Sequence, residues 1–169
     1  MTRIAIDAMG GDYAPAAIVD GAVWAAIDYN VPIELVGKED EIKQELDRIA
    51  KKGISSNRGG YYSHKIKVDL SKLDIKITNA DEVIEMGEPV GQAIRKKRKS
   101  SIVLAVDAVA KGSSDAVVAA GSTGAAMASS LFGLGRLTGI ERPAIALTLP
   151  TIKRPLLLLD AGANSSCTP

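Results

Sequence analysis

The sequence predicts an α/β fold with a three-layer αβα arrangement, in which helices cover both faces of a mostly parallel sheet. Short runs of Ile, Val, Leu and Ala alternate with segments of helical periodicity along most of the 169 residues, as in strands joined by crossover helices. Aromatic residues make up only 4% of the chain, so we expect a core of the small branched side chains that buried parallel strands carry. We expect residues 1–169 to form a single α/β domain.

The first half of the chain alternates strands with helices. Residues 3–7 and 33–36 have the composition of strands, and residues 14–29 and 38–52 have apolar positions at helical spacing. Residues 53–74 are rich in Gly, Ser and Asn at their start and lack a clear period, which indicates an irregular insertion, either a loop or a small surface hairpin.

The second half continues the alternation. We expect strands at 75–78, 115–120, 144–149 and 156–160, and helices at 89–97, 101–111 and 124–137. The strands at 115–120 and 156–160 are apolar enough to be buried. Because the sequence stops soon after the last strand with no helix to cover it, we expect it to be part of a longer chain or to need a partner.

Composition excludes several classes of protein. A net charge of +1 provides no field to hold nucleic acid. Cys167 is the single cysteine and His64 the single histidine, so neither a disulfide nor a metal cluster is expected, and a reducing cytoplasm is the expected compartment. No apolar run approaches the roughly 20 residues that span a bilayer, while peripheral attachment to a membrane is left open.

The loop after the first strand reads DAMGGD, with Asp7, Gly10, Gly11 and Asp12, and Pro15 follows it. Adjacent glycines let a backbone turn its N–H groups toward an anion such as phosphate. A second interpretation is a tight turn in which Asp12 caps the following helix.

The loop after the strand at 115–120 contains Gly121, Ser122, Thr123 and Gly124. Two hydroxyl groups and several unpaired N–H groups at a helix start attract oxyanions. Capping of the helix by Ser122 or Thr123 is an equally good interpretation.

A third loop of this kind follows the strand at 156–160 and contains Asp160, Gly162 and Asn164. Since ligands of parallel sheets bind beyond the carboxyl ends of the strands, the three loops are expected to converge on one edge. The phosphate-binding sequence GxxxxGK[ST], the dinucleotide sequence GxGxxG after the first strand and the hydrolase sequence GxSxG are all missing.

The densest basic run contains Arg95, Lys96 and Lys97, followed by Arg98 and Lys99. Cations at the carboxyl end of a helix are favoured by its dipole, so a solvated helix end is one interpretation. The other is a contact for an acidic partner, because a local patch can steer association without a large net charge.

Long segments of the sequence resemble the PlsX family, the phosphate:acyl-[acyl carrier protein] acyltransferases. The resemblance runs, in order, through IAIDAMGGDYAP, DEVIEMGEPVGQAIRKKRKSS, DAVVAAGSTGAAMASSLFGLGRL, RPAIALTLPT and LLLLDAGAN, and covers nearly the whole chain outside residues 53–74. Three positions depart from the family pattern: Tyr13 stands where His is usual, Ser122 where Asn is usual, and Ser166 where Asp is usual. A tyrosine is a poor base near neutral pH, so the resemblance gives no general base at position 13.

The resemblance implies a fold similar to the phosphotransacetylase and isocitrate dehydrogenase group, and a protein about twice this length that forms a homodimer. It implies transfer of a fatty acyl group from acyl carrier protein to inorganic phosphate, with neither cofactor nor metal, and a chain of 169 residues that is inactive or nearly so alone. The residues expected at the reacting groups are Gly121, Thr123 and Asn164. Those expected to bind phosphate or substrate are Asp7, Gly10, Gly11, Asp12, Ser122, Gly124, Asp160 and Gly162. Arg95, Lys96 and Lys97 are expected to contact the carrier protein.

Other functions remain open on the sequence. A related enzyme could use acyl-coenzyme A, and a dehydrogenase of similar fold could use a nucleotide. A non-catalytic half-domain that binds a carrier protein or a complementary chain is the third alternative.

Overall fold

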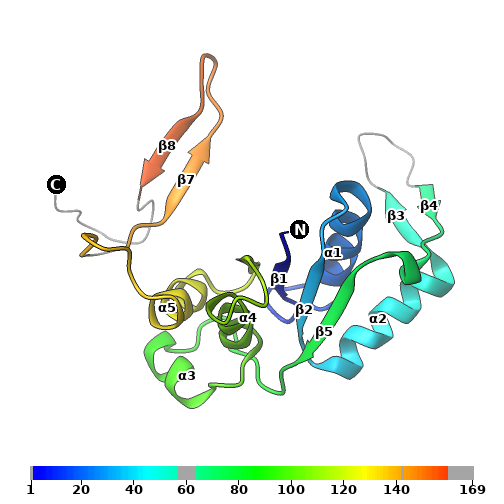
Figure 1. Cartoon of the computed structure of the whole chain (residues 1–169), viewed down its shortest axis with the longest axis horizontal. Helices are drawn as coiled ribbons and strands as arrows, with labels where there is room; N and C mark the ends of the chain where they lie inside the picture. Colours follow the sequence, from blue (N-terminus) through cyan, green and yellow to red (C-terminus); the bar gives the residue numbers. More distant parts are fainter. Residues whose placement is uncertain (1, 57–63, 142, 160–169) are drawn as a thin grey trace. The chain divides into compact units, whose positions relative to one another are not determined.

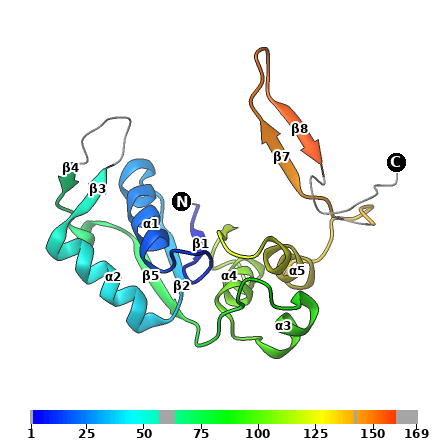
Figure 2. The ribbon, with the colours of Figure 1, turned by 180° about the vertical axis from the view of Figure 1, so that it is seen from behind.

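The computed structural model describes residues 2–56, 64–141 and 143–159 of the chain (Figures 1 and 2). The chain divides into two compact units, Met1–Leu134 and Gly135–Pro169. The first unit holds the αβα layers, and the second holds a pair of strands.

A four-stranded parallel sheet forms the centre of the first unit. Its strands are β1 (Ile4–Asp7), β2 (Ile33–Gly37), β5 (Ile75–Asn79) and β6 (Ala116–Val118), in the order β5-β2-β1-β6. Helices separate these strands in the sequence, and every pair of neighbours is parallel. This confirms the predicted α/β class.

Helices cover both faces of the sheet. Helices α1 (Ala16–Tyr29) and α2 (Glu39–Lys52) pack on one face, where Ile6 and Leu35 belong to the same buried cluster as the helix side chains. Helix α4 (Ser101–Ala110) covers the other face, which carries Ala5 and Val36, because successive side chains of a strand point to opposite faces.

Two further helices complete the layer on the α4 side. Helices α3 (Val90–Lys96) and α5 (Thr123–Gly133) pack with α4 around a third buried cluster that includes Val106 and Ala125. A Cβ atom at position 133 would lie 2.6 Å from Val106 Cγ1, so a larger residue there would force Val106 or the helix to shift. Helices α4 and α5 therefore approach closely at this point.

Residues 53–74 contain a pair of short strands. Strands β3 (Ile54–Ser56) and β4 (His64–Ile66) are antiparallel, and the short 3₁₀-helix η1 (Leu70–Lys72) follows. Of the two interpretations of this segment, the small hairpin agrees with the structure.

Two predictions about buried strands were wrong. Strand β6 is at the edge of the sheet, and Val118 is 52% exposed because β1 is its single neighbour among the described residues. Strands β7 (Ala146–Leu149) and β8 (Leu156–Leu159) do not extend the parallel sheet. They pair antiparallel with each other, and a two-stranded sheet cannot bury its own side chains, so all eight residues are exposed.

A buried carboxylate joins three segments beneath α4. Glu34 in β2 is 2% exposed and accepts hydrogen bonds from Thr78 Oγ1 at 2.6 Å, Ser114 Oγ at 2.9 Å and Lys76 Nζ at 3.2 Å. Burial alone would raise the pKa of Glu34, but these three donors outweigh it and the pKa is lowered. The network ties β2 to β5 and to the turn before β6.

We predict that Ser114→Ala destabilises the fold by about 1–3 kcal/mol, because one oxygen of a buried carboxylate loses its donor. Denaturant unfolding at neutral pH measures this change. Thr2→Val, which removes an exposed hydroxyl, is the control and should change the free energy of unfolding little.

The pKa of Glu34 is lowered in the folded state, so this carboxylate contributes stability at pH values above its ordinary pKa of 4.5. That contribution is lost as the pH falls through the folded-state pKa. The Glu34→Gln variant should therefore lack part of the acid sensitivity of the unchanged chain.

Candidate functional site at the ends of strands β1 and β6

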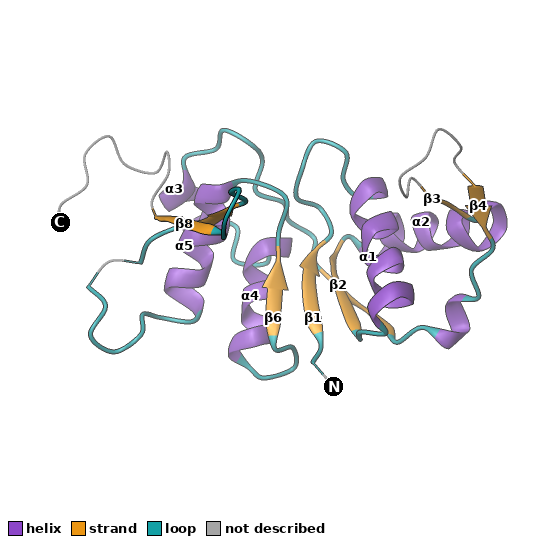
Figure 3. Cartoon of the chain, turned by 90° about the horizontal axis from the view of Figure 1, so that it is seen from above, coloured by secondary structure: helices purple, strands orange, loops and turns teal. Residues whose placement is uncertain are grey.

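Strands β1 and β6 are neighbours that lead to helices on opposite faces of the sheet. Strand β1 is followed by α1, which packs on one face, and β6 is followed by α5, which packs with α4 on the other. Figure 3 shows the two loops leaving the same end of the adjacent strands. Such a switch point is where ligands of open parallel sheets bind.

The two loops meet backbone to backbone at their glycines. A Cβ atom at Gly121 would lie 2.9 Å from Gly10 Cα, and one at Gly10 would lie 3.0 Å from Gly121 N. Gly11 has φ of +113°, and a Cβ there would lie 3.1 Å from the carbonyl oxygen of Ala120. Side chains at these positions would separate the loops, so the glycines permit the contact.

A buried aspartate lies below this contact. Asp7, at the end of β1, is 4% exposed, and its Oδ1 accepts a hydrogen bond from the Met9 N–H at 3.2 Å. Its Oδ2 would lie 2.7 Å from a Cβ on Gly10. Burial raises the pKa of Asp7, and hydrogen bonds from the Ser101 hydroxyl and the N–H groups of Met9 and Gly10 offset this in part. Asp7 thus orients the first loop.

Ser101 is a site residue that the sequence reasoning missed. It is 1% exposed and begins α4, and its hydroxyl lowers the pKa of Asp7, which lies in a distant part of the sequence. The sequence signal was the Ser100–Ser101 pair at a predicted helix start, which indicates capping and not a contact with β1.

The second loop presents unpaired N–H groups. Ser122 is the N-cap of α5, and its Oγ accepts from the Ala125 N–H at 3.3 Å. The Ser122 hydroxyl therefore serves as a helix cap. The N–H groups of Gly121, Ser122, Thr123 and Gly124 have no acceptor among the described residues, and the helix dipole adds positive potential at this point.

Asp12 does not cap α1. The N-cap position is Pro15, without a side-chain hydrogen bond, and Asp12 is exposed with no partner in the described part of the chain. Tyr13, beside it, is 80% exposed. The Gly11 and Asp12 N–H groups likewise have no acceptor among the residues described here, so the first loop adds donors to those of the second.

The third predicted loop, with Asp160, Gly162 and Asn164, lies outside the described residues. Its convergence with the other two loops therefore stays a prediction. The structure brings together Asp7, Gly10 and Gly11 from one predicted loop with Gly121 from another.

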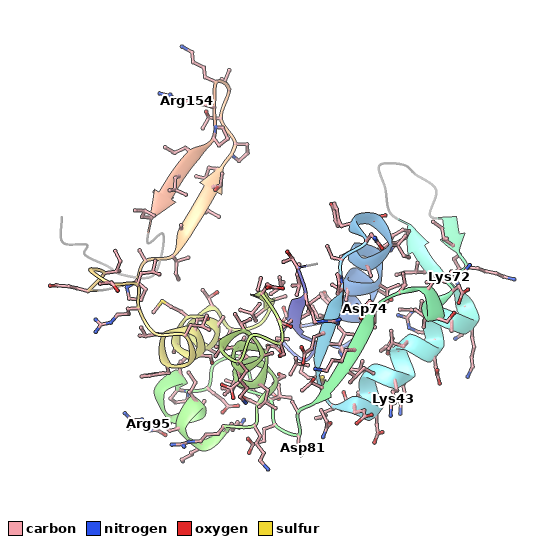
Figure 4. All side chains as sticks on the ribbon, viewed as in Figure 1. Lys43, Lys72, Asp74, Asp81, Arg95 and Arg154 are labelled. Carbon is pink, nitrogen blue, oxygen red and sulfur yellow. The ribbon has the colours of Figure 1, made fainter. Side chains whose placement is uncertain are left out.

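The basic run lies on and after α3. Arg95 and Lys96 occupy the last turn of α3 and are exposed, and Figure 4 shows Arg95 extending away from this helix. Lys97 Nζ donates to the Val83 carbonyl oxygen at 2.7 Å and forms an ion pair with Glu88. Lys97 is thus occupied internally, and its ammonium group lowers the pKa of Glu88.

The residues whose positions are described contain no group of three His, Cys, Asp or Glu side chains that could hold a metal ion. None of the helices they form is both long and apolar enough to cross a membrane.

Known proteins match this chain over nearly its whole length. The chain is 51% identical over 167 residues to the phosphate acyltransferase of Pelotomaculum thermopropionicum, covering 99% of this chain and 43% of that protein. It is 49% identical over 169 residues to the phosphate acyltransferase of Desulforamulus reducens, covering 100% of this chain and 45% of the relative. The chain thus spans less than half the length of these relatives.

A family comparison gives the same result. The model described as fatty acid synthesis protein matches residues 2–59 and 61–169, which include both glycine loops. This agrees with the resemblance carried by the sequence motifs, and the chain belongs to the fatty acid synthesis protein family, whose relatives named above are phosphate acyltransferases.

Proposed function

We propose that this chain is the amino-terminal part of a phosphate acyltransferase, which moves a fatty acyl group from acyl carrier protein to inorganic phosphate. The observation that carries the proposal is the backbone contact between the glycine loops of β1 and β6, which groups unpaired N–H donors at a switch point. The names of the relatives supply the reaction class.

Phosphate suits the donors of this site. Backbone N–H groups at a helix start bind oxyanions without a side-chain charge, and the exposed Thr123 hydroxyl adds a donor beside them. Asp7 is not a phosphate ligand in this proposal, because a carboxylate would repel the anion. Its role is to hold the first loop through Met9 and Gly10.

The reaction needs positioning more than acid–base chemistry. An oxygen of hydrogen phosphate attacks the thioester carbonyl carbon and a tetrahedral oxyanion forms. The C–S bond then breaks, and the carrier leaves as a thiol that has taken the phosphate proton while acyl phosphate is released. Holding both reactants together can contribute about 7–11 kcal/mol. Each N–H group aimed at the oxyanion contributes about 3–4 kcal/mol. Gly121, Thr123 and Asn164 are the proposed contacts at the reacting groups.

The remaining proposals concern partners and compartment. Arg95 and Lys96 are the proposed contacts for the acidic carrier, since they have no ion-pair partner among the described residues, whereas Lys97 is paired with Glu88.

We also propose a cytoplasmic homodimer for the full-length protein. Alternative substrates are acyl-coenzyme A or a nicotinamide nucleotide, and the isolated chain is proposed to be a carrier-binding half-domain without turnover.

The reaction is tested by following phosphate-dependent release of thiol from acyl carrier protein, with hydroxylamine to trap acyl phosphate. The protein is this chain joined to the remaining carboxyl-terminal part of the Pelotomaculum relative, because the chain covers 43% of that protein. We expect Gly121→Ala to lower kcat about 100-fold or more, since its Cβ would meet Gly10 Cα at 2.9 Å and displace the donors.

Gly21→Ala in α1 is the matched control, because a Cβ there has nothing within 4 Å. It should leave kcat within about twofold. Acyl phosphate formation that survives Gly121→Ala at full rate would remove the glycine contact from the mechanism. Nicotinamide reduction in place of acyl phosphate would support the dehydrogenase alternative.

The role of Asp7 is tested by the pH dependence of stability. Because the folded-state pKa of Asp7 is raised, its contribution to stability is greatest below the ordinary value of 3.8 and is lost as the pH rises through the folded-state pKa. We therefore expect Asp7→Asn to gain stability relative to the unchanged chain as the pH rises from about 4 to 8, measured by denaturant unfolding. Ser101→Ala should steepen the pH dependence, because it removes a donor to the carboxylate. Parallel curves for all three proteins would contradict this role.

For the carrier contact, we expect Arg95→Glu combined with Lys96→Glu to weaken binding of a bacterial acyl carrier protein roughly tenfold at low salt and to flatten its salt dependence. Lys51→Glu with Lys52→Glu is the matched control, because these lysines occupy the same last-turn position on α2. Equal losses in both double variants would indicate a general charge effect and not a contact at α3.

A further inference from the structure

We propose that Lys97 is a positioning residue for the N–H donors at the start of α5. The inference rests on the proposed function, because these donors are the ones assigned to phosphate and to the reacting carbonyl group. Lys97 acts through residues 80–89, which join β5 to α3 and are called the β5–α3 segment below.

The Lys97 ammonium group closes a turn in the β5–α3 segment. Its Nζ donates to the Val83 carbonyl oxygen at 2.7 Å and pairs with the Glu88 carboxylate. That carboxylate also accepts from the Glu85 N–H at 2.8 Å, and the Glu88 N–H donates to the Glu85 carbonyl oxygen at 3.3 Å. One side chain thus holds both ends of residues 83–88.

The same part of the chain packs against the first turn of α5 at two points. Ile84, inside the closed turn, is 9% exposed and belongs to the buried cluster that contains Ala125. Val90, which follows the β5–α3 segment, lies beside Gly124, where a Cβ atom would be 3.0 Å from Val90 Cγ2. Movement of the turn that Lys97 closes would therefore be transmitted to α5.

The donors depend on the orientation of this first turn. Hydrogen bonds weaken steeply as an N–H group turns away from its acceptor, and a misplacement of about 1 Å can cost about 100-fold in rate. Within α5 the turn is capped by Ser122 Oγ, and the distance of 3.3 Å to the Ala125 N–H is long for such a bond. Packing from the β5–α3 segment adds a restraint from outside the helix.

A matched control is available on α2. Arg48 is also paired with carboxylates, those of Asp20 and Glu45, and its side chain is 33% exposed, against 32% for Lys97. Helix α2 packs on the opposite face of the sheet from α5. Because partly exposed ion pairs contribute little to overall stability, Arg48→Met and Lys97→Met should differ in their local effects.

The restraint is measured by amide hydrogen exchange in the 169-residue chain. In the first turn of α5 the Ala126 N–H donates to the Ser122 carbonyl oxygen at 3.0 Å. At the same position of α2 the Ile42 N–H donates to the Lys38 carbonyl oxygen, also at 3.0 Å. We expect Lys97→Met to speed exchange at the first amide about tenfold and to leave the second within about twofold.

The control should leave both amides unaffected. We expect Arg48→Met to change exchange at Ala126 by less than about twofold. This measurement needs neither phosphate nor acyl transfer, so it tests the role of Lys97 separately from the proposed function.

Kinetics separate positioning from a general loss of stability. The protein is this chain joined to the carboxyl-terminal part of the Pelotomaculum relative. We expect Lys97→Met to raise the KM for phosphate about fivefold to tenfold and to leave the KM for acyl carrier protein within about twofold, because only the anion donors are displaced. Arg48→Met should change neither KM by more than about twofold.

Two further variants test the route. Glu88→Gln keeps an oxygen that can accept from Lys97 but removes the charge, so it should raise the KM for phosphate only about twofold to threefold. Val90→Ala removes the methyl group beside Gly124 and should raise the same KM. Combined with Lys97→Met, it should have less than the product of the two effects, because both act on one contact.

The results that overturn the inference are specific. They are unchanged exchange at Ala126 in Lys97→Met, an equal increase at Ile42, and KM values for phosphate and carrier that rise together. Absence of acyl phosphate from the unchanged joined protein would instead contradict the proposed function, and the exchange measurement would then decide the role of Lys97.

Discussion

The close approach of two glycine backbones, Gly10 after β1 and Gly121 after β6, is the constraint on which the candidate site depends. The loops can touch only where no Cβ atom intervenes, and the distances of 2.9 and 3.0 Å leave no room for one. Parallel pairing of β1 with β6 brings the loops to the same edge, and α1 and α5 pack on opposite faces of the sheet, so the chain turns in opposite directions there. Unpaired N–H groups of both loops are then grouped at that edge.

Two buried carboxylates lie on the same face of the sheet and differ in their electrostatics. Glu34, near the start of β2, has three side-chain donors, and its pKa is lowered. Asp7, at the end of β1, has fewer donors than its burial requires, and its pKa is raised. Removing a partner from a buried charge is strongly destabilising, and shifted carboxyl pKa values occur both in structural networks and at functional sites.

Helix α5 connects the candidate site with the β5–α3 segment. Its first turn carries the unpaired N–H groups near Gly121 and packs against Ile84 and Val90. Close packing at Gly133 against Val106 fixes the helix beside α4. Although the net charge is only +1, the helices group unpaired N–H donors in one region and unpaired basic side chains in another.

The sequence by itself determined the element order, the parallel α/β class and the loops after β1 and β6, because side-chain periodicity and turn residues report local conformation and burial. Observed boundaries fall within a few residues of the expected ones, as for α1 and α4. Only the tertiary structure decided that Gly10 meets Gly121, that Ser101 lowers the pKa of Asp7, that β6 is an exposed edge, and that β7 pairs with β8. The physical reason is that a hydrophobic or glycine-rich pattern predicts which residues of a segment are buried or where its backbone can turn. It does not predict which distant segment those residues contact, because that contact forms only when the layers pack.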